Sequence, residues 1–371
     1  MNDRTPTPVI VDCDLYTAFG PGVEACWNGL LNNHAAFSDC SRFHNEKFST
    51  SLAAMAPGAD VNGTKDIPAF FLDYLAPTAK KMPRDAELFL ASTVGEIEYI
   101  DNPERRCTCD MLLEHALKVC GKDNGRVVSA ACASSNSAFV SLYHHIRSGR
   151  LDSAGVIGTD YVSEFLFSGF ATLRALARTI ARPYDRNRDG LLLGDAASIV
   201  NICSAKKAAE LGLKPRAVLA SGGMSCDAVH ITAPMPHGEA LSEAIVHALD
   251  QAGLSPDDIG AVIGHGTGTR YNDDMEIQAI RRVFGERSVP MLSVKGACGH
   301  TLAGAGLVEA VVGVRMLETG LIPPQTSLVT PEPEAAKYVS TEIRKLERPR
   351  VLCMNSGFGG LNAVIILEAA S

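Results

Sequence analysis

The stretch from Arg126 to Arg147, RVVSAACASSNSAFVSLYHHIR, decides how this chain is interpreted. It begins with an apolar segment, Arg126 to Ala130, which predicts a short strand. After a tight turn come three residues of types that favour helix starts, and then apolar residues at helical spacing. Cys132 therefore falls between the end of a strand and the first turn of a helix. The three predicted capping residues are Ser134, Ser135 and Asn136.

A cysteine at this place has two interpretations. The N–H groups and dipole of a helix start favour negative charge, which would stabilise the thiolate of Cys132. Because the thiolate is the reactive form of cysteine, this position suits a nucleophile. The alternative is a small buried cysteine that only fills a packed turn, as most free cysteines do.

The composition is that of a soluble globular protein with α/β architecture. The chain has 371 residues, of which 46% are hydrophobic and 20% are charged, with 33 glycines. This length allows two domains or one large fold made of two halves. The net charge of −8 argues against nucleic-acid partners. The sequence contains no run that predicts a membrane span or a targeting segment, so we expect no membrane partner.

The cysteines indicate a reducing compartment. There are 11 of them, an odd number scattered along the chain, which does not suit a disulfide framework. We therefore expect a cytoplasmic protein. Cys107 and Cys109 form a CxC pair with no second pair at metal-ligand spacing, so we expect no metal site.

Strand and helix patterns alternate through both halves of the chain, which predicts mostly parallel sheets with covered faces. Residues 32–68 are an exception and predict mostly loop. A weak internal repeat links residues 128–149 with residues 292–320, because each reads as strand, small-residue turn and helix ending in glycine. Two similar halves predict a duplicated α/β fold with five layers.

Four loops carry polar residues, and three of them follow predicted strands. They contain Cys132, His265, Lys295 with His300, and the glycine turn before Asn362. The carboxyl ends of strands are where α/β sheets bind ligands. A cysteine with two histidines has the parts for acyl-thioester chemistry, in which the cysteine attacks and backbone N–H groups hold the oxyanion. Each histidine alone is weak evidence, because a single histidine is more often an ordinary loop residue.

Three motifs in this order resemble those of the β-ketoacyl synthase family of the thiolase superfamily. They are Ala131-Cys-Ala-Ser-Ser135, His265-Gly-Thr-Gly-Thr269 and Lys295-x-x-x-Gly299-His300. The segments 182–195 and 225–234 also resemble that family. The resemblance implies an α/β thiolase fold with layers in the order α-β-α-β-α. It implies an N-terminal half, residues 1–205, with the nucleophile, and a C-terminal half, residues 206–371, with both histidines.

The resemblance also implies an activity, that of a β-ketoacyl-[acyl carrier protein] synthase. Cys132 would take an acyl group as a thioester. His265 and His300 would assist the decarboxylation of a malonyl thioester and stabilise the enolate. The resulting carbanion would attack the acyl-cysteine in a Claisen condensation. Two histidines distinguish this pattern from thiolases, which use a second cysteine, and from initiating synthases, which use an asparagine.

Further site residues follow from the same resemblance. Lys295 would have an electrostatic role near His300, paired with Glu309, or would only form a buried ion pair. The oxyanion hole would use the N–H groups of Cys132 and Ser356. Supporting and substrate-binding residues complete the set. They are Glu309 and Phe358 as supports, and Thr267 and Thr269, which would bind the phosphopantetheine arm or only stabilise their turn.

The implied partners are an acyl carrier protein and a second subunit. No cofactor would be bound, because phosphopantetheine arrives on the carrier. Family members are homodimers or heterodimers with a second ketosynthase-like subunit. An alternative function is a non-catalytic partner subunit resembling a chain-length factor, although such subunits typically lack the nucleophile. Another is a thiolase-like enzyme that acts on free coenzyme A thioesters.

The chain departs from the family pattern at several places. The segment before Cys132 is short by some tens of residues, and Asp195 replaces a common glutamate. Ser356 takes the place of the expected gatekeeping phenylalanine, which predicts a poorly gated acyl pocket. These departures suggest a specialised fatty-acid or polyketide-type pathway. A basic cluster matches the family's carrier-protein patch, or is only a solvated surface run; it consists of Lys80, Lys81 and Arg84.

Overall fold

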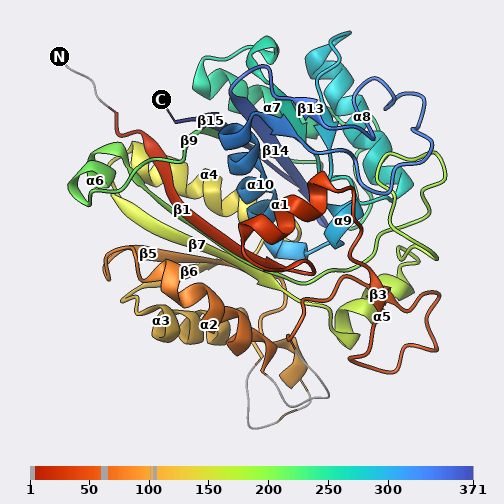
Figure 1. The fold of residues 1–371 in the computed structure, drawn as a ribbon, viewed down its shortest axis with the longest axis horizontal. Coiled ribbons are helices and arrows are strands. Elements are labelled where there is room, and N and C mark those ends of the chain that lie inside the picture. Colours follow the sequence, from red (N-terminus) through yellow and green to blue (C-terminus); the bar gives the residue numbers. More distant parts are fainter. Residues whose placement is uncertain (1–4, 60–65, 101, 103–106, 371) are drawn as a thin grey trace.

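The computed structural model describes residues 5–59, 66–100, 102 and 107–370 (Figure 1). Two sets of five strands join into one large sheet. The first set consists of β1 (Pro8–Thr17), β5 (Glu87–Ala91), β6 (Gly125–Val128), β7 (Ser153–Asp160) and β8 (Ala196–Ser204). The second set consists of β9 (Ala217–Cys226), β10 (Ala261–Ile263), β11 (Met291–Leu292), β14 (Arg350–Gly357) and β15 (Leu361–Ala369).

The two sets have the same topology. The first runs β6-β5-β7-β8-β1 and the second runs β11-β10-β14-β15-β9. In each set the order along the sheet is therefore third, second, fourth, fifth and first strand. The sets meet where β1 pairs with β9. This identity of strand order agrees with the duplication that the internal repeat predicted.

The expectation of mostly parallel sheets is wrong. In each set the second strand is parallel to its two neighbours. The fifth strand is antiparallel to both the fourth and the first. The reason is clearest in the second set, where the glycine turn 358–360 joins β14 to β15 as a tight hairpin, and a short hairpin connection can only give antiparallel strands.

Helices form three layers around the two sets of strands, as Figure 1 shows. Helices α4 (Ser134–Arg147) and α10 (Ala305–Thr319) contact each other and lie between the two sets. Helices α2 (Ile67–Ala79) and α3 (Cys109–Cys120) cover the outer face of the first set. Helices α7 (Glu239–Ala252) and α8 (Arg270–Phe284) cover the second. The predicted five-layered α-β-α-β-α thiolase fold is confirmed.

The remaining elements are short. The other helices are α1 (Val23–Leu31), α5 (Glu164–Thr172), α6 (Ala205–Glu210), α9 (Lys295–Cys298), and the 3₁₀ turns η1 (Ile97–Tyr99), η2 (Pro256–Asp258) and η3 (Leu302–Gly304). The other strands are β2 (Gly20–Pro21), β3 (Ser38–Asp39), β4 (Leu52–Ala53), β12 (Leu321–Ile322) and β13 (Arg344–Lys345). The proposed division between residues 205 and 206 falls at the start of α6, after the last strand of the first set.

Two further expectations concern loops and membranes. Residues 32–59 contain only two short strands and are otherwise loop, while residues 60–65 of the predicted loop lie outside the described residues.

Within the part of the chain that the structure describes, no helix combines the length and the apolar composition needed to cross a bilayer.

The start of α4 differs from the expected cap. The N-cap residue is Ala133, and no side chain caps this helix. The polar side chains predicted as caps instead tie the helix to its neighbours. The Ser135 hydroxyl donates to the carbonyl of Ala303, and the Asn136 amide donates to a carbonyl of β14 and to one of β15. Because the helix is buried between sheets, tertiary partners replace local ones.

Candidate active site

Cys132 lies on a strained turn between β6 and α4. Ala131, the residue before it, has a left-handed backbone with φ of 49°, which costs a non-glycine residue about 1–2 kcal/mol. The Ser134 hydroxyl holds this turn, because it donates to the Ala131 carbonyl and accepts from the Ala130 N–H. Gly357 packs against the same turn so closely that an added Cβ would lie 3.0 Å from the Ala130 carbonyl oxygen. The turn therefore fixes the sulfur at the meeting point of both halves.

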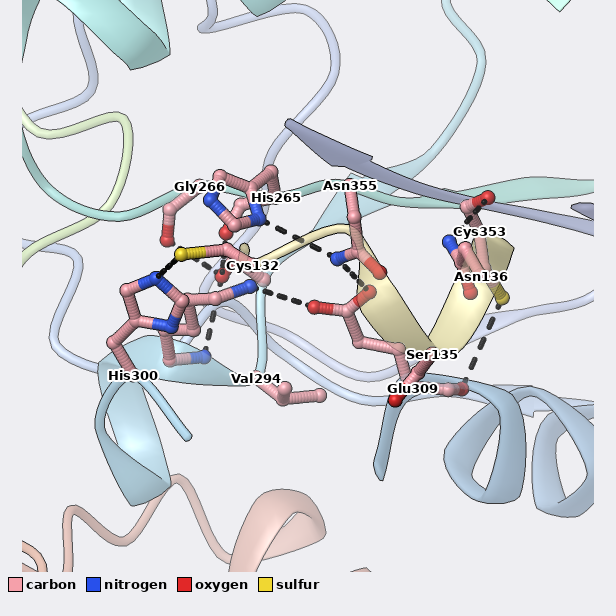
Figure 2. A network of polar contacts seen from close by, with 12 residues as sticks. Cys132, Ser135, Asn136, His265, Gly266, Val294, His300, Glu309, Cys353 and Asn355 are labelled. Carbon is pink, nitrogen blue, oxygen red and sulfur yellow. Dashed lines mark hydrogen bonds and ion pairs between the residues drawn. The ribbon is translucent and has the colours of Figure 1, made fainter. Parts of the chain in front are cut away.

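His300 is the histidine that contacts the sulfur. Its Nε2 lies 3.0 Å from Cys132 Sγ (Figure 2). Its other ring nitrogen, Nδ1, accepts the backbone N–H of Leu302 at 3.2 Å. A nitrogen that accepts a hydrogen bond carries no proton in the neutral ring. The proton of neutral His300 is therefore on Nε2, which faces the sulfur.

His265 completes the cluster from the loop after β10. The N–H groups of His265 and Gly266 both donate to the carboxylate of Glu276 on α8, at 2.5 and 2.6 Å. The rings of His265 and His300 meet edge to face, with centroids 5.1 Å apart. One side-chain atom from each of Cys132, His265 and His300 lies within 4.8 Å of the other two. The structure thus brings together the three residues that the motifs singled out.

Burial favours the neutral form of all three groups. Desolvation raises the pKa of the Cys132 thiol to about 12, although the positive charge of Lys295 opposes this rise. Desolvation and the charge of Lys295 lower the pKa of His265 and of His300 well below the ordinary value. Loss of solvent therefore opposes the stabilisation of the thiolate that the helix start was expected to give.

Lys295 and Glu309 form the predicted ion pair, which is confirmed. The Lys295 ammonium lies 2.6 Å from Glu309 Oε1, and both side chains are almost completely buried. The second carboxylate oxygen accepts the Asn355 amide at 2.8 Å. Desolvation raises the pKa of Glu309 to about 7, while Lys295 and Asn355 act to lower it. The pair places a fixed positive charge beside the histidines without contacting either ring.

Two cavities meet at Cys132. The first, of about 710 Å³, is lined by both histidines and by Thr267 and Thr269. The hydroxyls of these two threonines lie 2.9 Å apart. The second cavity, of about 1240 Å³, is mostly apolar, with a wall from α5, η1 and the start of α2. A molecule in either cavity would therefore reach the sulfur.

A bulky ring does stand between the cavities, at Phe358 rather than at Ser356. Phe358 lines both cavities and packs against Phe170, with ring centroids 5.8 Å apart. The Ser356 hydroxyl turns towards β15 and donates to Asn362 Oδ1 at 2.7 Å. The expectation of a poorly gated pocket is thus corrected, because Phe358 places a bulky side chain beside both cavities.

Asp195 anchors a wall of the second cavity. Its fully buried carboxylate binds the guanidinium of Arg42 and accepts the N–H groups of Ala56 and Val162. A carboxylate in this position connects the loop of residues 42–56 to the end of β7. The replacement of glutamate by aspartate keeps a fully bonded carboxylate.

The basic cluster lies at the wrong end of the sheet for the site. Lys80, Lys81 and Arg84 precede the first residue of β5, whereas Cys132 follows the last residue of the parallel strand β6. Lys81 pairs with Asp12 and Arg84 with Asp123. The assignment of this cluster as the carrier-protein patch is therefore wrong. The exposed arginines that line the first cavity are Arg174 and Arg270.

Asn355 is the site residue that the motifs missed. Its amide nitrogen lies 3.4 Å from His265 Nδ1 as well as 2.8 Å from Glu309. It is fully buried in β14, where it pairs with Ala363 of β15, beyond the last β14 residue that pairs with β10. The only sequence signal is an asparagine at the end of an apolar strand, directly before a glycine turn.

The buried ion pair gives a stability prediction. Lys295→Met leaves the Glu309 carboxylate buried without its cation, so we expect the free energy of unfolding to fall by ~3–5 kcal/mol. The double variant Lys295→Met/Glu309→Leu should recover part of this loss. As a control, Lys206→Met on exposed α6 should change stability by less than ~0.5 kcal/mol. Urea denaturation measures all three, and equal stabilities of both lysine variants would contradict the assignment.

Comparisons with known proteins agree with this geometry. Residues 125–208 match the family profile "Beta-ketoacyl synthase, N-terminal domain", and residues 216–329 match "Beta-ketoacyl synthase, C-terminal domain". Together the two matches cover more than half of the chain. The chain is 27% identical over 403 residues to 3-oxoacyl-[acyl-carrier-protein] synthase 2 of Staphylococcus aureus, covering 97% of this chain and 100% of that protein.

Solved structures share the fold. The ishigamide ketosynthase/chain length factor superposes with a TM-score of 0.92 at 26% identity, covering 99% of this chain and 100% of that one. A chain from the structure of a type II polyketide synthase acyl carrier protein in complex with its ketosynthase also superposes, with a TM-score of 0.86 at 21% identity. The match covers 99% of this chain and 100% of that one. With its thiolase fold and its cysteine and two histidines at one point, the chain belongs to the β-ketoacyl synthase family and is a condensing enzyme of the acyltransferase type.

Proposed function

We propose that this chain is an acyl carrier protein-dependent β-ketoacyl synthase that extends acyl chains by decarboxylative Claisen condensation. The observation that carries the proposal is the cluster of Cys132, His265 and His300, with atoms within 4.8 Å of one another where two cavities meet. One cavity would admit the phosphopantetheine arm of a carrier, and the other would hold the acyl chain. No cofactor is needed, because the reacting groups arrive on the carrier.

The first step is acyl transfer to Cys132. The sulfur forms a bond to the acyl carbonyl carbon, the bond to the carrier sulfur breaks, and the thiol proton ends on the carrier thiol. The negative oxygen formed on the way needs N–H donors. The N–H of Cys132 is one. The other would come from the glycine turn, either from Ser356 or from Phe358, because these residues flank Gly357, which packs against the Cys132 turn.

The second step is decarboxylation of a malonyl thioester. The bond to the carboxylate breaks, carbon dioxide leaves, and the electron pair forms an enolate whose charge gathers on the thioester oxygen. N–H groups on His265 and His300 would stabilise that charge, which exists only as carbon dioxide leaves. The enolate carbon then attacks the acyl-cysteine, and the bond to the Cys132 sulfur breaks with its electron pair on the sulfur. The resulting thiolate takes up a proton from solvent to restore the thiol, and the β-ketoacyl thioester remains on the carrier.

The alternative of a non-catalytic partner subunit has less support. Such a subunit does not need a nucleophile, whereas here the sulfur lies 3.0 Å from an imidazole nitrogen whose tautomer is fixed. The apolar cavity of about 1240 Å³ supports a long or bulky acyl group. It therefore supports a specialised fatty-acid or polyketide-type pathway.

Intact-mass spectrometry tests the nucleophile. Wild-type enzyme mixed with an acyl-loaded carrier protein should gain the mass of the acyl group, and Cys132→Ala should gain none. His265→Ala and His300→Ala should each lower condensation by ~10²-fold or more, because each removes one oxyanion donor. Carbon dioxide release and product mass measure this loss.

Two results would count against the proposal. An equal acyl adduct on Cys132→Ala would remove the nucleophile assignment, and full activity on free coenzyme A thioesters without carrier would favour a thiolase-like enzyme. A separate comparison of extension rates tests the proposed pathway class. Carriers loaded with short chains should be extended more slowly than those with long or bulky chains, because the second cavity is large; the reverse order would refute the specialised role.

We also propose a dimer, either of two copies or with a second ketosynthase-like subunit. Strand β6 ends the strand order, and among the described strands it pairs only with β5. Its free edge offers backbone groups to a strand of a second subunit. Light scattering should give twice the mass of one chain for a homodimer. A monomeric mass that persists after a candidate partner subunit is added would contradict both assemblies.

The carrier protein should dock at the mouth of the first cavity. Arg174 and Arg270 are exposed there, and neither forms an ion pair with a described residue. Acidic carriers are attracted to such unpaired charges. Arg174→Glu/Arg270→Glu should raise KM for the malonyl carrier by ~10-fold. The control variant Lys80→Glu/Arg84→Glu, at the opposite end of β5, should leave that KM unchanged. If the control raises that KM more than Arg174→Glu/Arg270→Glu does, the carrier docks at the basic cluster of Lys80, Lys81 and Arg84 instead.

A further inference from the structure

Asn355 links the buried ion pair to one histidine. Its amide nitrogen lies 2.8 Å from Glu309 Oε2 and 3.4 Å from His265 Nδ1, and Figure 2 shows its amide group between these two side chains. Glu309 in turn binds Lys295 through its other oxygen at 2.6 Å. The side chains of Lys295, Glu309, Asn355 and His265 therefore form one continuous buried chain.

The orientation of the Asn355 amide follows from its neighbours. A carboxylate only accepts hydrogen bonds, so the group that faces Glu309 is the NH₂ and not the carbonyl oxygen. The opposite orientation would place two oxygens against each other in a buried site. The same nitrogen faces His265 Nδ1. A donor therefore faces Nδ1 of this ring.

A donor at Nδ1 decides which nitrogen of neutral His265 carries the proton. Nδ1 then accepts, and the proton is on Nε2. For His300 the backbone N–H of Leu302 has the same effect. Both imidazoles thus hold their proton on Nε2, one through a backbone group and the other through a side chain that can be replaced.

We propose that Asn355 is a positioning residue that fixes His265 as the Nε2–H tautomer and so makes it a donor to the enolate oxygen. This inference rests on the proposed decarboxylation and adds a residue to it. Asn355 does not contact His300 or Cys132 through any hydrogen bond among the described residues. Its role should therefore be confined to decarboxylation, while acyl transfer to Cys132 proceeds without it.

Asn355→Asp tests the proposal because it keeps the shape and reverses the polarity. An acceptor at position 355 favours the proton on Nδ1 and removes it from Nε2. We expect carbon dioxide release from a malonyl thioester to fall by ~10²-fold, the scale of losing one oxyanion donor. Acyl transfer to Cys132, measured by intact mass, should keep its wild-type rate. Nitrogen NMR of ¹⁵N-histidine protein should show His265 protonated at Nε2 in the wild type and at Nδ1 in the variant.

Asn136→Asp is the matched control. Asn136 is equally buried and close by, but it donates only to the carbonyls of Cys353 and Ala363. Its variant should lose stability without separating the two half-reactions or changing the His265 signal. Asn355→Ala serves if the aspartate variant does not fold, because it removes the donor without adding a charge. It should give a mixture of both tautomers.

The outcomes separate this inference from the proposed function. If wild-type enzyme releases no carbon dioxide, the proposed function fails, and the NMR signals alone then decide whether Asn355 sets the tautomer. If wild-type enzyme is active and Asn355→Asp keeps both its rate and the Nε2 proton, the inference is overturned. A parallel fall of acyl transfer and decarboxylation in Asn355→Asp and Asn136→Asp would also overturn it, because that pattern indicates a structural role.

Discussion

The buried ion pair between Lys295 and Glu309 is the constraint on which the site depends. Two opposite charges taken out of water are tolerated only when each is paired and its remaining hydrogen-bonding groups are used. Glu309 meets this demand with Lys295 on one oxygen and Asn355 on the other. The pair thereby fixes three segments of the C-terminal half against one another, namely α9, α10 and the end of β14. Each of these segments contributes to the surroundings of Cys132.

Exclusion of water shapes the chemistry as much as the geometry does. Burial favours the uncharged forms of the thiol and of both imidazoles, and the charge of Lys295 acts on all three groups. Among buried side chains a charge that forms during the reaction interacts more strongly with fixed donors than it would in water. The polar groups of the resting site therefore face no negative charge on a substrate. They stabilise such a charge only when a substrate brings it or develops it.

The sequence predicted the parts of the site that are coded locally. Cys132, His265 and His300 each follow a strand, and the order of their motifs was enough to bring them together. Asn355 was not predicted as a site residue because its contacts depend on the register of β14 in the sheet. No motif of neighbouring residues encodes that register. The antiparallel fifth strands were missed for the same reason. The basic cluster was assigned wrongly because a run of basic residues does not show at which end of a sheet it lies.

The shared strand order has a consequence for how the enzyme is divided. In each half, the turn after the third strand leads into a helix of the central layer. One of these turns carries the sulfur and the other carries the imidazole of His300, and they touch at 3.0 Å. The two copies of this strand order therefore contribute different groups to the site. Neither half holds a reaction centre by itself, so activity is a property of the joint between them, and it disappears when the joint opens even if each half stays folded.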